Sequence, residues 1–252
     1  MAIPAKTIDE VLNELDLIID ETVADNNFLG IFAYVYRRTT AQIKQAIHDN
    51  QFMDNKRMEL MDVAFANLYL TAYRQYRAGL PCSSAWTTAF NAKNDSVTIM
   101  QHLMLGMNAH INLDLGIAAA AIASGDKLQL LKTDFMKVNQ ILNELVNEMQ
   151  SRISRVSRLM FLLDLGGKDT DEQIVNFSMV KAREQSWNLA NLLAVLPVND
   201  QQPAIDLADQ TITALGSVIK NPPGKFLKFI VRIVAYYEEK SVKTIIRKLR
   251  EG

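Results

Sequence analysis

The sequence predicts an all-α protein, a single helical domain over residues 1–252 with about seven or eight helices around a central buried helix at 95–124. Apolar residues recur at helical spacing along the whole chain, and helix-capping signals open several segments. No window alternates apolar and polar residues for long enough to indicate a strand. With 252 residues, 49% of them apolar, the chain can bury a substantial core.

Capping and stop signals predict where the helices begin and end. Thr7–Glu10 and Thr170–Gln173 are capping boxes, each of which opens a helix. Gly79 with Pro81, and the pair Pro222–Pro223, interrupt helices because glycine and proline cannot continue them favourably. The expected elements are, in order, residues 7–26, 29–50, 55–78, a short helix or ordered loop at 82–92, then 95–124, 133–165, 170–196, 203–220, and a basic amphipathic tail helix within 222–252.

Charge is unevenly distributed along the chain, whose formal net charge is −1. Residues 220–252 contain nine Lys or Arg and three Glu, so an acidic body is followed by a basic end. We expect the tail helix to pack on the body through its apolar face, with residues 243–250 in solvent. Peripheral membrane contact by this helix is the less favoured alternative. The negative overall charge and the absence of a recognised motif argue against nucleic-acid binding, and the oligomeric state stays open.

Cysteine usage and the first residues indicate the compartment. Cys82 is the single cysteine, so it cannot form an internal disulfide, and a reducing environment is expected. Met1 to Pro4 lead directly into an acidic segment, which is not the pattern of a secretory signal. Both observations predict a cytoplasmic protein.

The expected central helix carries polar residues but no charge between Asp95 and Asp114. A membrane span of ~20 apolar residues would leave its amides and histidines unpaired in lipid, so a buried helix of a soluble bundle is favoured. At ~100° per residue, Gln101, Asn108 and Asn112 lie on one side, and His110 and Asp114 share another. His102 lies about 12 Å from His110 along the axis, too far for one shared ion.

A histidine and an aspartate one helical turn apart have three interpretations. They can form a structural hydrogen-bonded pair, a metal half-site, or an acid–base unit in which Asp114 fixes the tautomer of His110. The chain contains only three histidines and no HExxH or CxxC motif, so a metal centre would depend largely on carboxylates. No Gly-rich phosphate loop is present, and the cofactor, if any, stays unknown.

Other charged residues occur on apolar helix faces. Asp62 shares its face with tyrosines, and Arg183 shares its face with Trp187, so Arg183 is expected to pair with Asp62 or Asp114. The alternatives are a buried ion-pair network and a polar pocket, and the pocket is favoured slightly because such residues recur on several helices. Its expected ligand-binding residues are Asn108, His102, Asp62, Arg183, Trp187, Arg38 and Trp86.

The function hypothesis is therefore a small-molecule site in the helical core, either a binding site or a hydrolase-type or metal-assisted active site. If it is catalytic, His110 is the general base or a metal ligand, and Asp114 orients it. The alternative is a non-catalytic interaction protein with a structural polar core, whose basic tail helix contacts a partner or a membrane surface.

The run Asn108-Ala-His-Ile-Asn-Leu-Asp-Leu115 resembles a bacterial family of helical proteins known chiefly as a domain of unknown function. The resemblance extends from about Phe28 to Leu193 and includes Trp86 and the run Ala182–Trp187. It implies an all-helical fold and a site around Asn108, His110 and Asp114, but no reaction. The His-x-x-x-Asp spacing is also similar to a segment of zinc-dependent phospholipase C and related nucleases, whose many further histidines this chain lacks.

Overall fold

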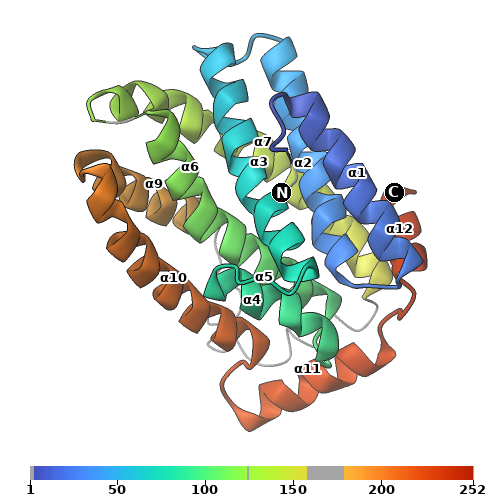
Figure 1. Ribbon diagram of the computed structural model, residues 1–252. Coiled ribbons are helices and arrows are strands. Elements are labelled where there is room, and N and C mark those ends of the chain that lie inside the picture. Colours follow the sequence, from blue (N-terminus) through green and yellow to red (C-terminus); the bar gives the residue numbers. More distant parts are fainter. Residues whose placement is uncertain (1–2, 124, 158–178, 252) are drawn as a thin grey trace.

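The computed structural model describes residues 3–123, 125–157 and 179–251, in which all regular secondary structure is helical and no strand occurs (Figure 1). The predicted all-α fold is confirmed. The helices are α1 (Ile8–Ala24), α2 (Leu29–His48), α3 (Asn55–Arg77), α4 (Ser84–Asn91), α5 (Ile99–Ala109), α6 (Leu115–Ile122), α7 (Lys127–Val156), α9 (Met179–Val195), α10 (Val198–Lys220), α11 (Lys225–Tyr237) and α12 (Val242–Arg250), with a 3₁₀ turn at Ala92–Asn94 and a π-helical turn at His110–Asp114.

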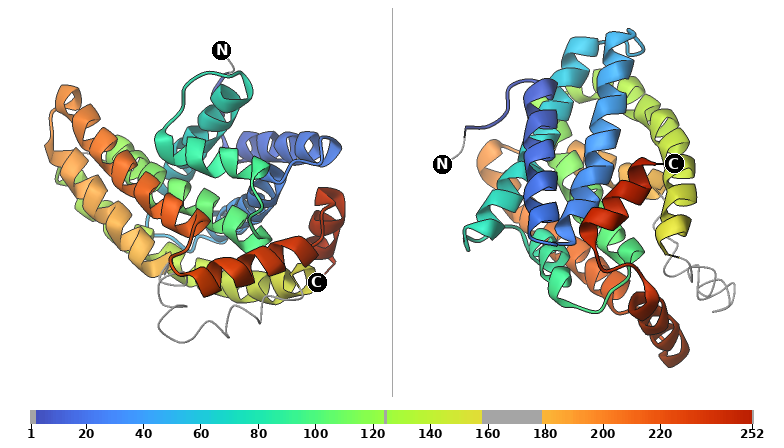
Figure 2. Two further views of the ribbon diagram at one scale, coloured as in Figure 1. Left: turned by 90° about the horizontal axis from the view of Figure 1, so that it is seen from below. Right: turned by 90° about the vertical axis from the view of Figure 1, so that its right-hand side faces the viewer.

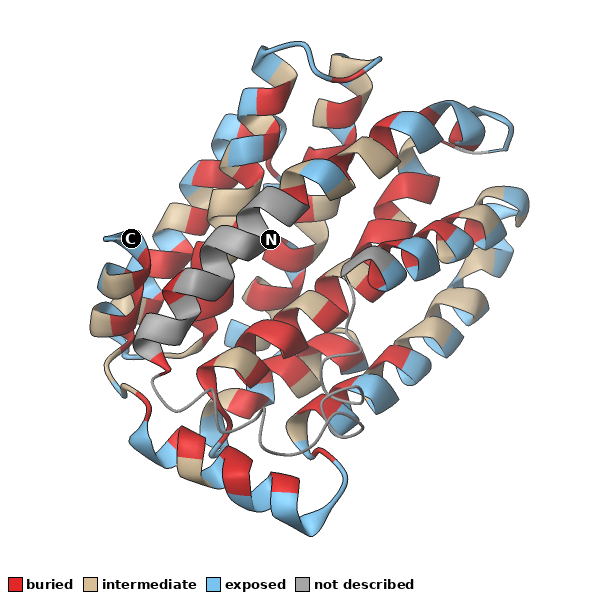
Figure 3. Cartoon of the chain, turned by 180° about the vertical axis from the view of Figure 1, so that it is seen from behind, coloured by how far each residue is buried: buried red, intermediate tan, exposed pale blue. Residues whose placement is uncertain are grey.

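The centre of the bundle is the nearly continuous helix formed by α5, the π turn and α6. It lies between α2 and α3 on one side and α9 and α10 on the other, while α4 packs against α5 and α10 (Figures 1 and 2). Residues along this central helix are mostly buried (Figure 3). None of the helices in the described ranges is both long enough and apolar enough to cross a membrane.

The central helix begins at Ile99, four residues later than Asp95, which the sequence suggested. Thr98 and Gln101 form a reciprocal capping box, which satisfies two backbone N–H groups at this end. The carboxylate of Glu238 accepts a further bond from the Ile99 N–H at 2.7 Å. The start is therefore fixed partly by a residue almost 140 positions away, which local sequence signals do not show.

The π turn at His110–Asp114 was not predicted. A π turn inserts one extra residue into a helix and is frequent at functional sites. Here the Ser186 hydroxyl of α9 donates a hydrogen bond to the carbonyl of Ile111, inside the turn. Ser186 is fully buried, and its bond links α9 to the π turn. It gives the Ile111 carbonyl a hydrogen-bond donor from outside the central helix.

Gly116 allows α9 to approach the central helix at this point. A Cβ at Gly116 would lie 2.8 Å from the carbonyl oxygen of Ser186 and 3.0 Å from the Cβ of Leu189. Gly106 has a similar role on the opposite side, where a Cβ would meet the Phe32 ring at 2.5 Å. The small residues of the central helix therefore place its polar side chains close to both neighbouring layers.

The C-terminal segment differs from the predicted single tail helix because it forms two helices. The chain leaves α11 at Glu238, whose carboxylate accepts bonds from Ile99 and from the Ser157 hydroxyl. Ser241 then caps α12 by accepting from the N–H of Thr244. The expectation that residues 243–250 are in solvent is wrong, since α12 buries Val242, Ile245, Ile246 and Leu249.

Two further boundaries move. α7 begins at Lys127 rather than near Thr133, directly after Gly125 reverses the chain with a φ of 57°. α10 begins at Val198 with Pro197 before its first turn, so Pro203 lies inside the helix instead of opening it. The predicted capping box at 170–173 and the predicted end of the fifth helix near 165 lie outside the described residues.

Gly116→Ala is expected to lower the free energy of unfolding by about 1–3 kcal/mol, because the added methyl group meets backbone and Cβ atoms of α9 that cannot move independently. The matched control is Gly216→Ala in α10, where the nearest atom is Nδ2 of Asn108 at 3.3 Å and helix propensity improves. Urea unfolding of both variants measures the difference. Equal stability of the two variants would show that α9 does not press on the central helix at Gly116.

Candidate functional site

The predicted His110–Asp114 pair is present and buried. Nδ1 of His110 lies 3.0 Å from Oδ2 of Asp114, and the Trp86 Nε1–H donates to the same oxygen at 2.9 Å. The three residues are 2%, 4% and 2% exposed, so water does not compete for these bonds. Trp86 was expected to bind a ligand, and its indole N–H instead holds the carboxylate that orients the histidine.

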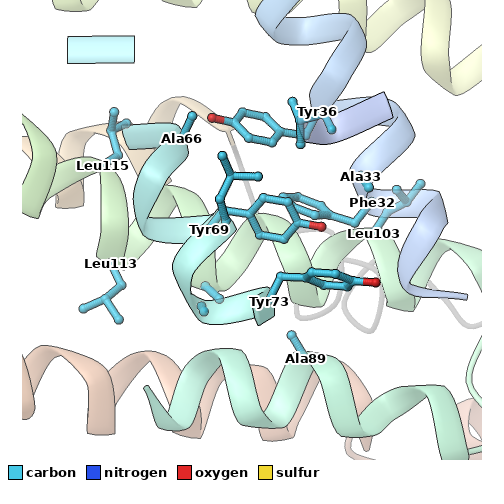
Figure 4. Close-up of a cluster of buried hydrophobic side chains, with 14 of the residues drawn as sticks. Phe32, Ala33, Tyr36, Ala66, Tyr69, Tyr73, Ala89, Leu103, Leu113 and Leu115 are labelled. Carbon is cyan, nitrogen blue, oxygen red and sulfur yellow. The ribbon is translucent and has the colours of Figure 1, made fainter. Parts of the chain in front are cut away.

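The imidazole of His110 lies inside a cage of aromatic rings from α2, α3 and α4. Phe65 stacks on it, with ring centroids 3.6 Å apart and planes inclined by 8°, and the Tyr36 ring meets it edge-on at 4.4 Å. Phe32, Tyr69 and Trp86 complete the cage, each with its centroid 5.9 Å from the imidazole. Figure 4 shows how Phe32 and Tyr36 of α2 approach Tyr69 of α3. Phe65 is the one ring of this cage that is only partly buried.

Burial shifts both members of the pair toward their neutral forms. It lowers the pKa of His110, and it raises the pKa of Asp114, while their mutual hydrogen bond opposes each shift. Oδ2 of Asp114 receives the indole N–H and also faces Nδ1 of His110, which suits a carboxylate that accepts two bonds. We therefore assign a neutral His110 with its proton on Nδ1, which leaves the lone pair on Nε2.

Several buried polar atoms around this cage have no hydrogen-bond partner among the described residues. Nε2 of His110 is one of them, and Asp62 Oδ2 and Tyr69 Oη of α3 are the others. The hydroxyl groups of Tyr36 and Thr40, one helical turn apart on α2, interact with each other. Tyr36 and Tyr69 are themselves rings of the cage, and their centroids lie 5.7 Å apart. The negative charges of Asp62 and Asp114, after burial, help to raise the pKa of the Tyr36 phenol, so both carboxyl groups lie within electrostatic range of it.

Asp62 joins this cluster, and none of the cations among the described residues forms an ion pair with it. Burial, and next the charge of Glu59, raise the pKa of Asp62 to about 7. The predicted pairing of Arg183 with Asp62 or Asp114 is wrong. A carboxyl group left in a dry site without a cation becomes easier to protonate, because its charged form is disfavoured. Asp62 is thus a group beside the cage that can exchange a proton near neutral pH.

Arg183 lies in a different contact. Its guanidinium donates to the backbone carbonyl of Phe135 in α7 and lies over the Phe135 ring, 4.3 Å from the centroid. Trp187 packs against the same ring, with centroids 4.9 Å apart. Burial lowers the pKa of Arg183 to about 9. A carbonyl and a π-face replace the expected carboxylate, so Arg183 and Trp187 belong to the α7–α9 contact rather than to the His110 cage.

The second polar stripe of the central helix is structural. Nδ2 of Asn108 donates to the carbonyl of Ile212 at 2.9 Å, and Asn112 donates to Oδ1 of Asn108 at 3.1 Å. Gln101 donates to the carbonyl of Ile219 at 2.8 Å. The predicted separation of two stripes is confirmed, but Asn108 binds α10 instead of lining the site with His110.

His102 also lies apart from His110. It lines a small cavity of about 10 Å³, which has room for roughly one water molecule. Burial lowers the pKa of His102 to about 4, so the ring is neutral at pH 7. The cavity shares Phe32, Tyr69 and Trp86 with the cage, and its complete lining is Phe28, Leu29, Phe32, Tyr69, Trp86, Ala89, Phe90, His102 and Gly106.

The remaining predicted residue, Arg38, is half-buried on α2. It follows Tyr36 by two residues, so at ~100° per residue it lies on the side of the helix away from Tyr36. Its neighbour Arg37 pairs with Asp16 of α1 at 2.9 Å. The expected ligand-binding residues did not include Tyr36, Tyr69, Phe65 or Ser186, although the sequence places Tyr36 on the helix of Arg38, and Phe65 and Tyr69 on the helix face of Asp62. The spacing of Phe32, Tyr36 and Thr40 along one face of α2 was the signal for Tyr36, and Ser186 lies within the Ala182–Trp187 run.

The described residues contain no group of three or more His, Cys, Asp or Glu side chains that could hold a metal ion. His110 and Asp114 supply two such groups, and their facing atoms are already bonded to each other. The arrangement suits proton transfer at Nε2 of His110 more directly than metal coordination.

These observations define an all-α protein whose central helix carries a buried His–Asp pair at a π turn. The chain belongs to DUF5995, a family of unknown function, whose family model matches residues 8–222. No curated protein and no solved structure matches the chain.

Asp62→Asn is expected to change how stability depends on pH. Because the folded pKa of Asp62 is about 7, against an ordinary value of 3.8, the folded state holds a proton that the unfolded state releases within this window. The stability of the wild-type protein therefore falls as pH rises through the window, by up to about 4 kcal/mol, and Asp62→Asn removes this fall.

The measurement is the difference in free energy of unfolding between wild type and Asp62→Asn at several pH values. Taking the difference removes the opposite contribution of His102, whose lowered pKa makes stability rise with pH. Asp20→Asn, at an exposed position of α1, is the control. Parallel curves for wild type and Asp62→Asn would contradict the burial of an uncompensated carboxyl group.

Proposed function

We propose that the protein binds a small molecule at the aromatic cage and that His110 acts there as a general base, in hydrolase-type chemistry. The observation that carries the proposal is the state of the imidazole. One ring nitrogen is fixed by Asp114, which Trp86 holds in turn, whereas the other is buried and has no partner in the described part of the chain. A histidine oriented in this way through one nitrogen is the usual arrangement of a catalytic base.

The unpaired oxygens near the cage support binding as well as catalysis. A buried polar atom without a partner costs about 1–3 kcal/mol, and native proteins contain few of them. Among the described residues, the unpaired atoms of Asp62, Tyr69 and His110 come from α3 and from the π turn that packs against it. A bound molecule with polar groups on an apolar or aromatic body would pair with these atoms and pack against the rings.

Proton transfer in the proposed site uses two groups. His110 accepts a proton from the attacking water or hydroxyl group at Nε2, and Asp114 stabilises the imidazolium that forms. The lowered pKa of His110 keeps its lone pair available at neutral pH. Asp62, with a pKa of about 7, is available in both protonation states and can return a proton.

Entry to the site requires a ring to move. Phe65 stacks directly on the imidazole and is partly exposed, so it forms the outer wall of the cage. Rotation of the Phe65 side chain would uncover the face of the imidazole without disturbing the Asp114–Trp86 bond. Phe65 therefore acts as a gate in this proposal.

The alternative from the sequence, a structural polar core in an interaction protein, gives a different outcome for the same variants. In that case His110 serves only to fix the π turn, and its replacement lowers stability without altering any activity. The aromatic cage alone does not distinguish these cases, so the test measures activity and stability together.

The test uses hydrolysis of p-nitrophenyl acetate, a small aromatic ester, as the probe. His110→Gln is expected to reduce the protein-dependent rate at least about tenfold. General-base catalysis contributes ~100-fold or more with a natural substrate, and we expect a smaller contribution with this probe. Phe65→Ala is expected to raise the rate by opening the cage. His102→Gln, which alters the other buried histidine of the central helix, is the matched control and keeps the wild-type rate.

Thermal unfolding of each variant accompanies the rate measurement. A His110→Gln protein that stays folded and hydrolyses the ester at the wild-type rate would contradict the proposed base. Loss of stability in His110→Gln, together with unchanged rates in all three variants, would favour the structural interpretation.

A further inference from the structure

The outward face of α11 carries an aromatic stripe beside a basic edge. At ~100° per residue, Phe226, Phe229, Ile233 and Tyr236 fall on one side of the helix, with Tyr237 at the border. Phe226 and Phe229 are 59% and 61% exposed, and Tyr236 and Tyr237 are 77% and 70% exposed. The opposite face buries Leu227, Ile230, Val231, Val234 and Ala235. The helix is therefore apolar on the side that packs and again on the side that faces outward.

This concentration of exposed rings occurs nowhere else in the described ranges. Every Phe, Tyr or Trp side chain that is mostly exposed there belongs to α11. Figure 2 shows α11 at the edge of the body, and Figure 3 shows exposed residues along it. The family model ends at residue 222, three positions before α11 begins, so the helix lies outside the segment that carries the His110 site.

The charges on the outward face are all positive. Lys225, Lys228 and Arg232 are exposed along one edge of the aromatic stripe. The two acids that follow the helix are used elsewhere. Glu238 is buried and bonds to Ile99, and Glu239 accepts from the N–H groups of Lys240 and Ser241. The face therefore combines rings that favour an apolar interface with cations that favour an anionic one.

We propose that α11 docks the protein on the surface of an anionic lipid bilayer. Phe226, Phe229 and Tyr236 would enter the headgroup region, where aromatic rings are favoured, while Lys228 and Arg232 meet the lipid anions. A helix lying in the interface plane with an apolar face and basic residues is typical of peripheral attachment. This proposal is independent of the proposed activity of His110.

A second copy of the chain fits the same face less well. In a two-fold symmetric dimer the same patch meets itself, so the basic edges of the two α11 helices would be brought together without acids to neutralise them. A bilayer that contains phosphatidylserine supplies the negative charge instead. Each Lys or Arg near such a surface contributes about fivefold to partitioning.

Co-sedimentation of the full chain with lipid vesicles tests the proposal. Binding is expected to vesicles of phosphatidylcholine with phosphatidylserine, to decline as salt is added, and to be weak with phosphatidylcholine alone. The double variant Lys228→Gln/Arg232→Gln is expected to bind about 25-fold more weakly, and Phe226→Ser/Phe229→Ser at least about tenfold more weakly.

The controls are Leu17→Ser, which removes a side chain that is 64% exposed on α1, and Lys127→Gln, at an exposed position of α7. Both are expected to bind as wild type does, and melting temperatures show that all variants stay folded. Absence of binding to phosphatidylserine vesicles, or equal binding by the α11 variants, would overturn the proposal. So would a dimer, seen by sedimentation velocity, that Phe226→Ser/Phe229→Ser dissociates.

Discussion

The π turn at His110–Asp114 is the constraint on which the rest of the site depends. It adds a residue to the central helix. On one side of this helix Asn108 binds α10, and on the other side His110 faces α2 and α3. The Ser186 hydroxyl bonds to a carbonyl within the turn, and Gly116 admits α9 to the distance that this bond requires. One local irregularity thus couples three layers of the bundle to the orientation of one imidazole.

The interior separates its polar groups by function. Amides on one stripe of the central helix saturate carbonyls of α10 and lock the register of that packing. Ionisable groups on the other stripe and on α3 remain partly unpaired among aromatic rings. Hydrogen-bonded amides add to the stability of the fold, whereas unpaired carboxyl and imidazole atoms reduce it. Proteins retain such a loss of stability mainly where the unpaired atoms serve binding or catalysis.

The sequence predicted the helical fold, most helix boundaries, the two polar stripes and the His110–Asp114 pair, because each depends on periodicity or on residues one turn apart. It did not predict the π turn, which depends on Ser186 from another helix, or the start of α5, which depends on Glu238. The pairing assigned to Arg183 failed for a related reason. A shared apolar face shows that a guanidinium is buried, but not that its partner is the Phe135 carbonyl rather than a carboxylate.

The protonation of the His110 ring is the most direct test of this account, because the proposed base needs its lone pair on Nε2. Two-dimensional NMR that correlates the imidazole nitrogens with the ring protons, on protein labelled with ¹⁵N, reports both nitrogens separately. The account predicts a neutral ring with the proton on Nδ1 at neutral pH, and a ring that stays neutral well below the ordinary pKa of histidine. A proton on Nε2, or an imidazolium at neutral pH, would contradict it.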